Sequence, residues 1–119
     1  MSGTQLTLNL LEGSVSFSFT PDAARELKAA FAELMTNLKT VAAAKTDPKS
    51  AGKPQRLKSM EYRYVGEVFL EMECNPNIWP TPFAAKVLVT VRDDRIRLMA
   101  EAELTRAIED VNQYLEHFG

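Results

Sequence analysis

Residues 60–74 read MEYRYVGEVFLEMEC, and this stretch decides which kind of fold the chain can form. Its even positions from Met60 to Cys74 are apolar apart from Gly66, and charged side chains hold most of the odd positions. A two-residue period of this kind is typical of a β-strand with one buried face. We therefore predict one long strand over residues 60–74, with a bulge or bend at Gly66.

The same two-residue period appears twice near the N-terminus. Apolar residues hold alternate positions in two short runs, at Leu6, Leu8 and Leu10 and then at Val15, Phe17 and Phe19. Glu12 and Gly13 lie between the runs and supply a turn. These features predict a β-hairpin over residues 4–19.

A long helix is predicted to follow the hairpin. Thr20 can cap a free backbone amide, Pro21 is tolerated at the first helical position, and Asp22 suits the positive end of the helix. Apolar residues then recur every three or four positions, at Leu27, Phe31, Leu34, Leu38 and Val41. One apolar stripe at this spacing predicts an amphipathic helix that runs to about residue 44.

Two strands and a second helix are predicted after the 60–74 stretch. Apolar residues alternate at Val87, Val89 and Val91 and again at Ile96 and Leu98, on either side of a tight turn at Asp93-Asp94. The last segment has helical spacing at Leu104, Ile108, Val111, Leu115 and Phe118, with Asp110 among the residues that face outward. The order ββαβββα predicts an α+β domain: an antiparallel sheet of about five strands with both helices packed on one face.

The other face of the predicted sheet is expected to be charged. Alternation places four carboxylates and four basic groups on it, namely Glu61, Glu67, Glu71 and Glu73 with Lys86, Arg92, Arg95 and Arg97. We expect these groups to pair in surface salt bridges.

Composition restricts the class of protein. A chain of 119 residues with 45% apolar and 25% charged residues is typical of a single soluble domain, here residues 1–119. A net charge of −2 excludes an overall electrostatic nucleic-acid binder, although not a local one. Residues 1–11 lack the charged start and apolar run of a secretory signal, and no apolar run is long enough to span a membrane. We therefore expect a cytoplasmic location without membrane insertion.

Residues that carry chemistry are scarce. Cys74 is the single cysteine and His117 the single histidine, so the chain can form neither an internal disulfide nor a tetrahedral Cys/His zinc site. The five glycines are too scattered for a phosphate-binding loop. We predict no catalytic residue, no metal and no cofactor.

Residues 75–83, NPNIWPTPF, are the most distinctive segment because they combine the single tryptophan with three prolines. In one interpretation this loop contacts a partner protein, through Trp79, Pro80, Pro82 and Phe83; buried tryptophans often dominate interface energies. In the other, Trp79 closes the open end of the core and its indole N–H binds a backbone acceptor.

Residues 45–58 are predicted to be a flexible basic loop, with five basic side chains against one acidic. Its charges can steer a partner toward the domain, through Lys49, Lys53, Arg56 and Lys58. The loop lacks interleaved aromatic residues, which single-strand binders use for base stacking, so nucleic acid is the less favoured partner.

Residues 60–116, with NPNIWPTPFAAKVLVTVRDDRIRL and AELTRAIEDVNQYLE, resemble small conserved proteins of unknown function from cyanobacteria. The resemblance implies a cytoplasmic regulatory protein of a photosynthetic bacterium. It includes no catalytic motif, and it implies neither an activity nor any functional residue.

Three functions remain open on these observations. The first is a non-enzymatic regulatory or adaptor domain that binds another protein or a second copy of itself. The second is a nucleic-acid-binding module that uses the basic loop. The third is a small-ligand-binding domain with an apolar pocket between helices and sheet, rimmed by Tyr62 and Tyr64 beside Trp79.

Overall fold

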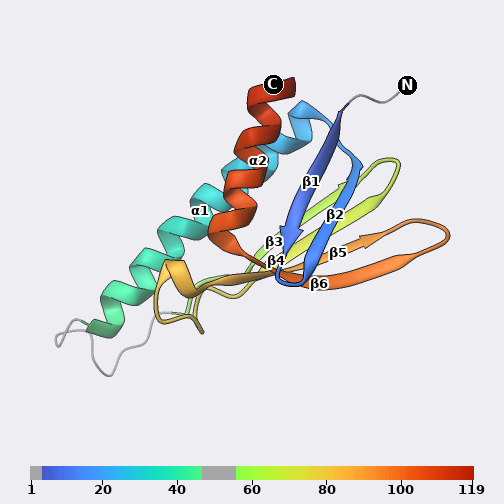
Figure 1. Cartoon of the computed structure of the whole chain (residues 1–119). Helices are drawn as coiled ribbons and strands as arrows, with labels where there is room; N and C mark the ends of the chain where they lie inside the picture. The colour runs from blue at the N-terminus through green and yellow to red at the C-terminus, as the bar shows by residue number, and fades with distance from the viewer. Residues whose placement is uncertain (1–3, 47–55) are drawn as a thin grey trace.

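The computed structural model describes residues 4–46 and 56–119. Within them the chain forms two α-helices, six strands and one short 3-10 helix (Figure 1). In chain order these are β1 (Gln5–Leu10), β2 (Gly13–Ser18), α1 (Pro21–Thr46), β3 (Met60–Val65), β4 (Phe69–Cys74), η1 (Pro82–Ala84), β5 (Lys86–Arg92), β6 (Arg97–Glu103) and α2 (Leu104–Phe118). The predicted α+β class is confirmed.

The strands form two antiparallel sheets. β1 and β2 make a separate hairpin, and the other four strands form a sheet in the order β3-β4-β5-β6. The hairpin touches the edge of the larger sheet, where the backbone N–H of Leu11 donates to the carbonyl of Glu101 at 3.0 Å. The prediction of one sheet of about five strands was therefore wrong.

The sixth strand arises because residues 60–74 fold back on themselves. Tyr62 lies opposite Met72 and Tyr64 opposite Leu70, and the turn closes where the N–H of Gly66 donates to the carbonyl of Val68 at 3.0 Å. Three residues separate the two strands, so even positions pair with even positions. The alternation therefore continues unchanged through the turn. For this reason the sequence pattern of a hairpin with a three-residue turn is the same as that of a single bent strand.

Both helices and the β1–β2 hairpin cover one face of the four-stranded sheet, which we call its inner face. Several side chains on this face are fully buried, among them Leu70, Met72, Val87 and Val89. α1 and α2 pack against each other, and α2 also packs against β1, so that α2 lies between α1 and the hairpin (Figure 1). This layer contributes Leu6, Phe19, Leu27 and Phe31 to the same core.

A buried carboxylate joins β1 to α2. Asp110 is 5% exposed, and its oxygens accept hydrogen bonds from the backbone N–H of Asn9 at 2.8 Å and from the Asn9 amide at 2.9 Å. Arg106 Nε lies 3.5 Å from the same carboxylate. The expectation that Asp110 faces outward was wrong, because the hairpin covers that side of α2.

The molecule is elongated, with a longest extent of 56 Å and a radius of gyration of 15.5 Å. A compact chain of this length has a radius of gyration of about 13.5 Å. α1, with 26 residues, is about 39 Å long at 1.5 Å per residue, which confirms the expected long helix. Among the described residues, no helix combines the length and the apolar character needed to cross a membrane.

Candidate functional site

Residues 75–83 form an ordered connection from β4 to η1. Asn75 Oδ1 accepts hydrogen bonds from the backbone N–H of Asn77 at 2.9 Å and from its side-chain amide at 2.8 Å. At the other end Thr81 caps η1, because its hydroxyl accepts from the N–H of Ala84 at 3.2 Å, and Pro82 opens the helix. Local side chains and prolines therefore hold the loop in one conformation.

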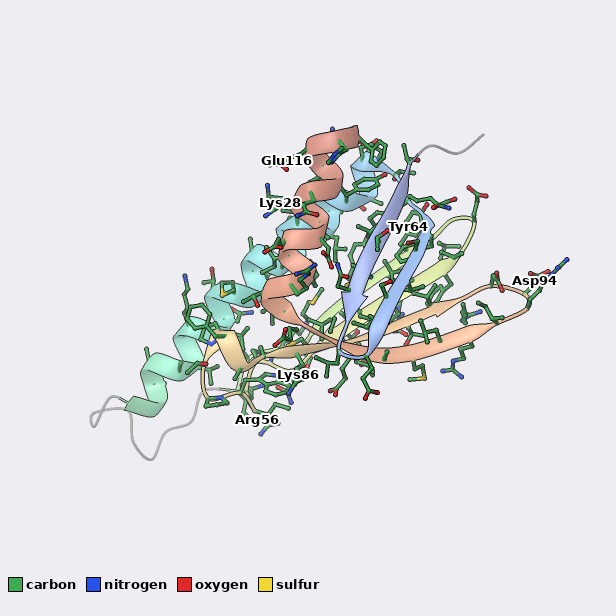
Figure 2. All side chains as sticks on the ribbon, in the orientation of Figure 1. Lys28, Arg56, Tyr64, Lys86, Asp94 and Glu116 are labelled. Atoms are coloured by element: carbon green, nitrogen blue, oxygen red, sulfur yellow. The ribbon has the colours of Figure 1, made fainter. Side chains whose placement is uncertain are left out.

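Asn77 attaches this loop to the end of the basic segment. The N–H of Leu57 donates to Asn77 Oδ1 at 2.9 Å, and Asn77 Nδ2 donates to the carbonyl of Leu57 at 2.8 Å. The pair imitates one step of a β-ladder across 20 residues of sequence. It holds the exposed residues Arg56 and Lys58 beside the loop, and Figure 2 shows Arg56 and Lys86 at the same end of the molecule. Of the predicted steering charges, Lys49 and Lys53 lie outside the described residues.

Trp79 is half-buried and packs against the core. Burial of the Cys74 thiol raises its pKa to about 11, and the nearby indole of Trp79 lowers this pKa by a smaller amount. On the open side, Lys86 Nζ lies 5.5 Å from the centre of the indole ring, within the range of a cation–π contact. Trp79 thus covers the core with one side and faces solvent with the other.

A shallow hollow of about 230 Å³ opens beside this tryptophan. It is lined by residues of the loop and of β4, β5 and β6, including Glu73, Ile78, Trp79, Lys86, Leu88 and Glu101. Ile78, in the wall of this hollow, is 62% exposed. We call Ile78, Trp79, Lys86 and Leu88 the Trp79 surface.

The other predicted contact residues do not join this surface as one patch. Pro80 is exposed, Pro82 is half-buried, and Phe83 is 81% exposed. η1, which carries Phe83, packs against both α1 and α2, whereas the hollow beside Trp79 opens on the far side of the sheet. The loop therefore wraps around the end of the sheet and presents two separate apolar sites.

Both tyrosines, which the sequence analysis expected at the rim of a pocket, pack into or against the core. Tyr62 is 8% exposed and its hydroxyl donates to the carbonyl of Ala23 at 3.0 Å; burial raises the pKa of this phenol. Tyr64 packs edge-on against Phe19, with ring centres 4.8 Å apart. The space between helices and sheet at Tyr62 is thus filled by core side chains. Three hollows lined by described residues measure about 160–230 Å³, against about 300–1,000 Å³ for typical small-molecule sites.

The face of the four-stranded sheet that points away from the helices is covered by none of the described elements, and we call it the outer face. Large apolar side chains lie along it, namely Val65, Phe69, Leu88 and Met99. Arg92 and Arg97 lie toward the strand ends that meet the turns, whereas Arg63 lies at mid-strand beside Glu71. Acidic side chains lie toward the opposite ends, at Glu61, Glu73, Glu101 and Glu103, with Lys86 among them.

The strand register separates most of the charged groups that were expected to pair across this face. Glu73 lies opposite Leu88 and Glu71 lies opposite Thr90, so the strand register places neither carboxylate directly across from a basic group of β5. Arg63 Nε lies 3.0 Å from Glu71 Oε2, which is an ion pair the sequence analysis did not propose. Alternation alone identifies which residues share the face, whereas the register decides which of them meet.

The described residues offer little reactive chemistry. None of the His, Cys, Asp and Glu side chains within residues 4–46 and 56–119 gather in a group of three or more that could hold a metal ion. Cys74 is buried, and its raised pKa keeps the thiol protonated and weakly nucleophilic at neutral pH. His117 lies on the last turn of α2, with Nδ1 2.9 Å from the carbonyl of Gln113 in the same helix.

Comparison of the chain with protein-family models, with curated proteins and with solved structures gave no significant match.

Proposed function

We propose that this chain is a non-enzymatic adaptor or regulatory domain that acts by binding another protein. The observation that supports the proposal is the Trp79 surface, where an exposed isoleucine and a half-buried tryptophan border a shallow hollow. Protein interfaces are enriched in aromatic residues at their centres, and a few of these residues carry most of the binding energy. Charged groups at the edge then contribute mainly to steering and register.

The charges around the hollow favour a protein over a nucleic acid. Glu73 and Glu101 lie in its wall and would repel a phosphate backbone, whereas a protein partner can offer donors to them. Arg56 and Lys58 are held beside the loop, and Arg92 and Arg97 lie at the other end of the sheet. The acidic end of the outer face thus separates the pair Arg56 and Lys58 from the pair Arg92 and Arg97.

The isoleucines of the chain allow a matched test of the proposal. Ile78 in the Trp79 surface is 62% exposed, and Ile96 in the β5–β6 turn is 67% exposed, so a serine at either position leaves the core intact. Tagged full-length protein captures its partner from native lysate in this experiment. We expect Ile78→Ser to reduce the captured partner about tenfold or more, as for a hot-spot residue, and Ile96→Ser to capture as much as wild type.

Two results would contradict the proposal. One is equal capture by wild type, Ile78→Ser and Ile96→Ser, because the Trp79 surface would then take no part in binding. The other is retention on heparin at low salt that falls steeply as salt rises, together with DNA or RNA in the captured material. That second result would favour the nucleic-acid module instead.

A further inference from the structure

The two edges of the four-stranded sheet differ in how the rest of the chain covers them. β6 forms one edge, and the β1–β2 hairpin closes it in part, since the N–H of Leu11 donates to the carbonyl of Glu101 at 3.0 Å. β3 forms the other edge. Within residues 4–46 and 56–119, no backbone hydrogen bond from another element reaches the outward side of β3. The described elements therefore leave this edge open.

The ladder shows which backbone groups of β3 are open. In antiparallel pairing, alternate residues exchange hydrogen bonds with the neighbouring strand, and the residues between them point the other way. The bond from the Gly66 N–H to the Val68 carbonyl continues the register of β3 with β4, so the even-numbered residues of β3 bond to β4. Three residues therefore have N–H and C=O groups that point away from the sheet, namely Glu61, Arg63 and Val65. The same rule, followed across the sheet, predicts the outward carbonyl of Glu101 that binds the hairpin.

A hollow opens between this edge and α1. It measures about 200 Å³ and is lined by four residues of α1 and by the chain at the start of β3, with Ala30, Leu34 and Met60 as its apolar wall. Further along β3, the Tyr62 hydroxyl donates to the carbonyl of Ala23 at 3.0 Å, so α1 rests on this strand. α1 and the open edge of β3 thus form the two walls of one groove, which we call the β3 groove.

We infer that the β3 groove binds an extended segment of a partner protein, which adds a strand to the sheet beside β3. In this mode of recognition main-chain hydrogen bonds supply affinity, and pockets for alternate side chains supply specificity. Alternate side chains of the added strand point toward the inner face, and one of them enters the hollow. The hollow suits one apolar side chain, because its volume is below that of a typical small-molecule site.

The charges along the groove favour a basic segment. Three exposed carboxylates border it, namely Glu26, Glu33 and Glu61. Glu26 precedes Ala30 by one helical turn, and its charge, after the larger effect of burial, raises the pKa of Tyr62. Lys58 is the basic residue of the hollow, whereas Arg63 is already held by Glu71 at 3.0 Å on the outer face. Carboxylates are thus in excess, and the matching segment has an apolar residue beside lysine or arginine.

A second copy of this chain fits the same edge poorly. α1 rests on β3, so antiparallel pairing of two β3 strands would bring two α1 helices to the same face of the joint sheet. Paired strands are about 4.8 Å apart, whereas packed helices need about 8–10 Å. A single extended segment carries no helix to this position.

A proline at the edge tests the added strand. Arg63→Pro removes one outward N–H and keeps every hydrogen bond between β3 and β4, and proline is tolerated at such edge positions. Arg63→Ala is the matched control, because it loses the same side chain and keeps the N–H. A phage-displayed library of random peptides of about ten residues is selected on the wild-type protein, and the enriched peptides are synthesised. We expect them to bind Arg63→Pro at least about tenfold more weakly than Arg63→Ala.

Amide hydrogen exchange locates the bound strand and covers the case in which Arg63→Pro fails to fold. In the free protein the outward amides of Glu61, Arg63 and Val65 are expected to exchange quickly, while the even-numbered amides of β3 are protected by β4. An enriched peptide is expected to slow exchange at Arg63 by at least about tenfold.

A charge reversal tests the chemistry of the segment. Glu33→Lys in the wall of the hollow is expected to weaken the enriched peptides by about fivefold or more. Glu116→Lys makes the same change at an exposed position of α2 and is expected to bind like wild type (Figure 2). Equal binding by these two variants would contradict a basic segment.

The β3 groove is overturned if the library gives no enriched peptide, or if enriched peptides bind Arg63→Pro and Arg63→Ala equally. Slow exchange at Arg63 that appears without peptide as protein concentration rises would assign the edge to a second copy instead. The inference goes beyond the proposed function, because an added strand needs none of the residues of the Trp79 surface, although Ser59 borders both hollows. Capture by that surface is measured separately, so either proposal can fail alone.

Discussion

The two sheets of this molecule bury one face each, and they differ in what the other face presents. The free face of the β1–β2 hairpin carries short polar side chains, and Thr7 and Ser16 hydroxyls share a hydrogen bond of 2.7 Å. The outer face of the four-stranded sheet carries large apolar side chains with most of its charges sorted toward its two ends. Water satisfies the hydrogen bonds of a face of small hydroxyls. Covering partly exposed apolar groups, in contrast, lowers the free energy. The two free faces therefore differ in how much apolar surface they leave open to solvent.

The largest effect is expected from a substitution that breaks the attachment of the hairpin to α2. Asp110→Ala removes the acceptor for two hydrogen bonds from Asn9 and leaves a backbone N–H without a partner. We expect the free energy of unfolding in urea to fall by about 3 kcal/mol, with loss of hydrogen-exchange protection at Asn9. Glu109→Ala is the control, since the Glu109 side chain is 58% exposed and the change is expected to stay within about 0.5 kcal/mol. A loss below about 1 kcal/mol for Asp110→Ala would show that the carboxylate is not what holds β1.

A second prediction concerns the thiol beneath the Trp79 surface. Burial raises the pKa of Cys74 from its ordinary value near 9 to about 11, so the folded state holds the proton more tightly than the unfolded state. This stabilisation is complete below pH 9 and is lost as pH rises toward 11; two pKa units correspond to about 3 kcal/mol. Cys74→Ala is expected to lose less stability than wild type over this window, in urea titrations at each pH.

Tyr62 also has a raised pKa and lowers alkaline stability in both proteins, so the difference between wild type and Cys74→Ala isolates the thiol. Parallel curves for the two proteins would mean that Cys74 titrates at its ordinary pKa, and that Trp79 leaves it open to water.

The smallest expected effects sharpen the comparison between the two free faces. Met99→Ser on the outer face and Thr7→Ala on the hairpin both replace exposed side chains, so each is expected to change stability by less than about 0.5 kcal/mol in dilute protein. Urea titrations of both variants beside wild type check this expectation. A loss above about 1 kcal/mol for either variant would show that its side chain contributes to the core and is not a free surface group.

Local pattern predicted most of the fold. Alternation located the strands of the hairpin and of β5, and the Thr20-Pro21-Asp22 start located α1, because burial of one face and capping are decided within a few residues. The turn at Gly66 was missed for a physical reason. A three-residue turn keeps the parity of the inward positions, so the residues on either side continue one pattern although the chain reverses direction.

The candidate site was predicted only in part. Residues 75–83 stood out by composition, and in the structure Trp79 of this segment borders a hollow. Asn77 and Asp110 were missed as anchors because their partners lie 20 and 101 residues away. The sequence around a single polar residue does not show which distant backbone group that residue will bind. The charge pattern of the outer face was also hidden, since it depends on which strands are neighbours.

The link between Asn9 and Asp110 has a consequence for how the chain is made. These residues are 101 positions apart, which corresponds to about 5–20 s of synthesis at 5–20 residues per second. During that interval β1 and β2 have left the ribosome, while the helix that receives them has not yet emerged. Four apolar side chains that are buried in the folded protein are then available to any chaperone that recognises apolar segments, namely Leu6, Leu8, Phe17 and Phe19. The nascent hairpin thus keeps four apolar side chains uncovered until α2 has been made.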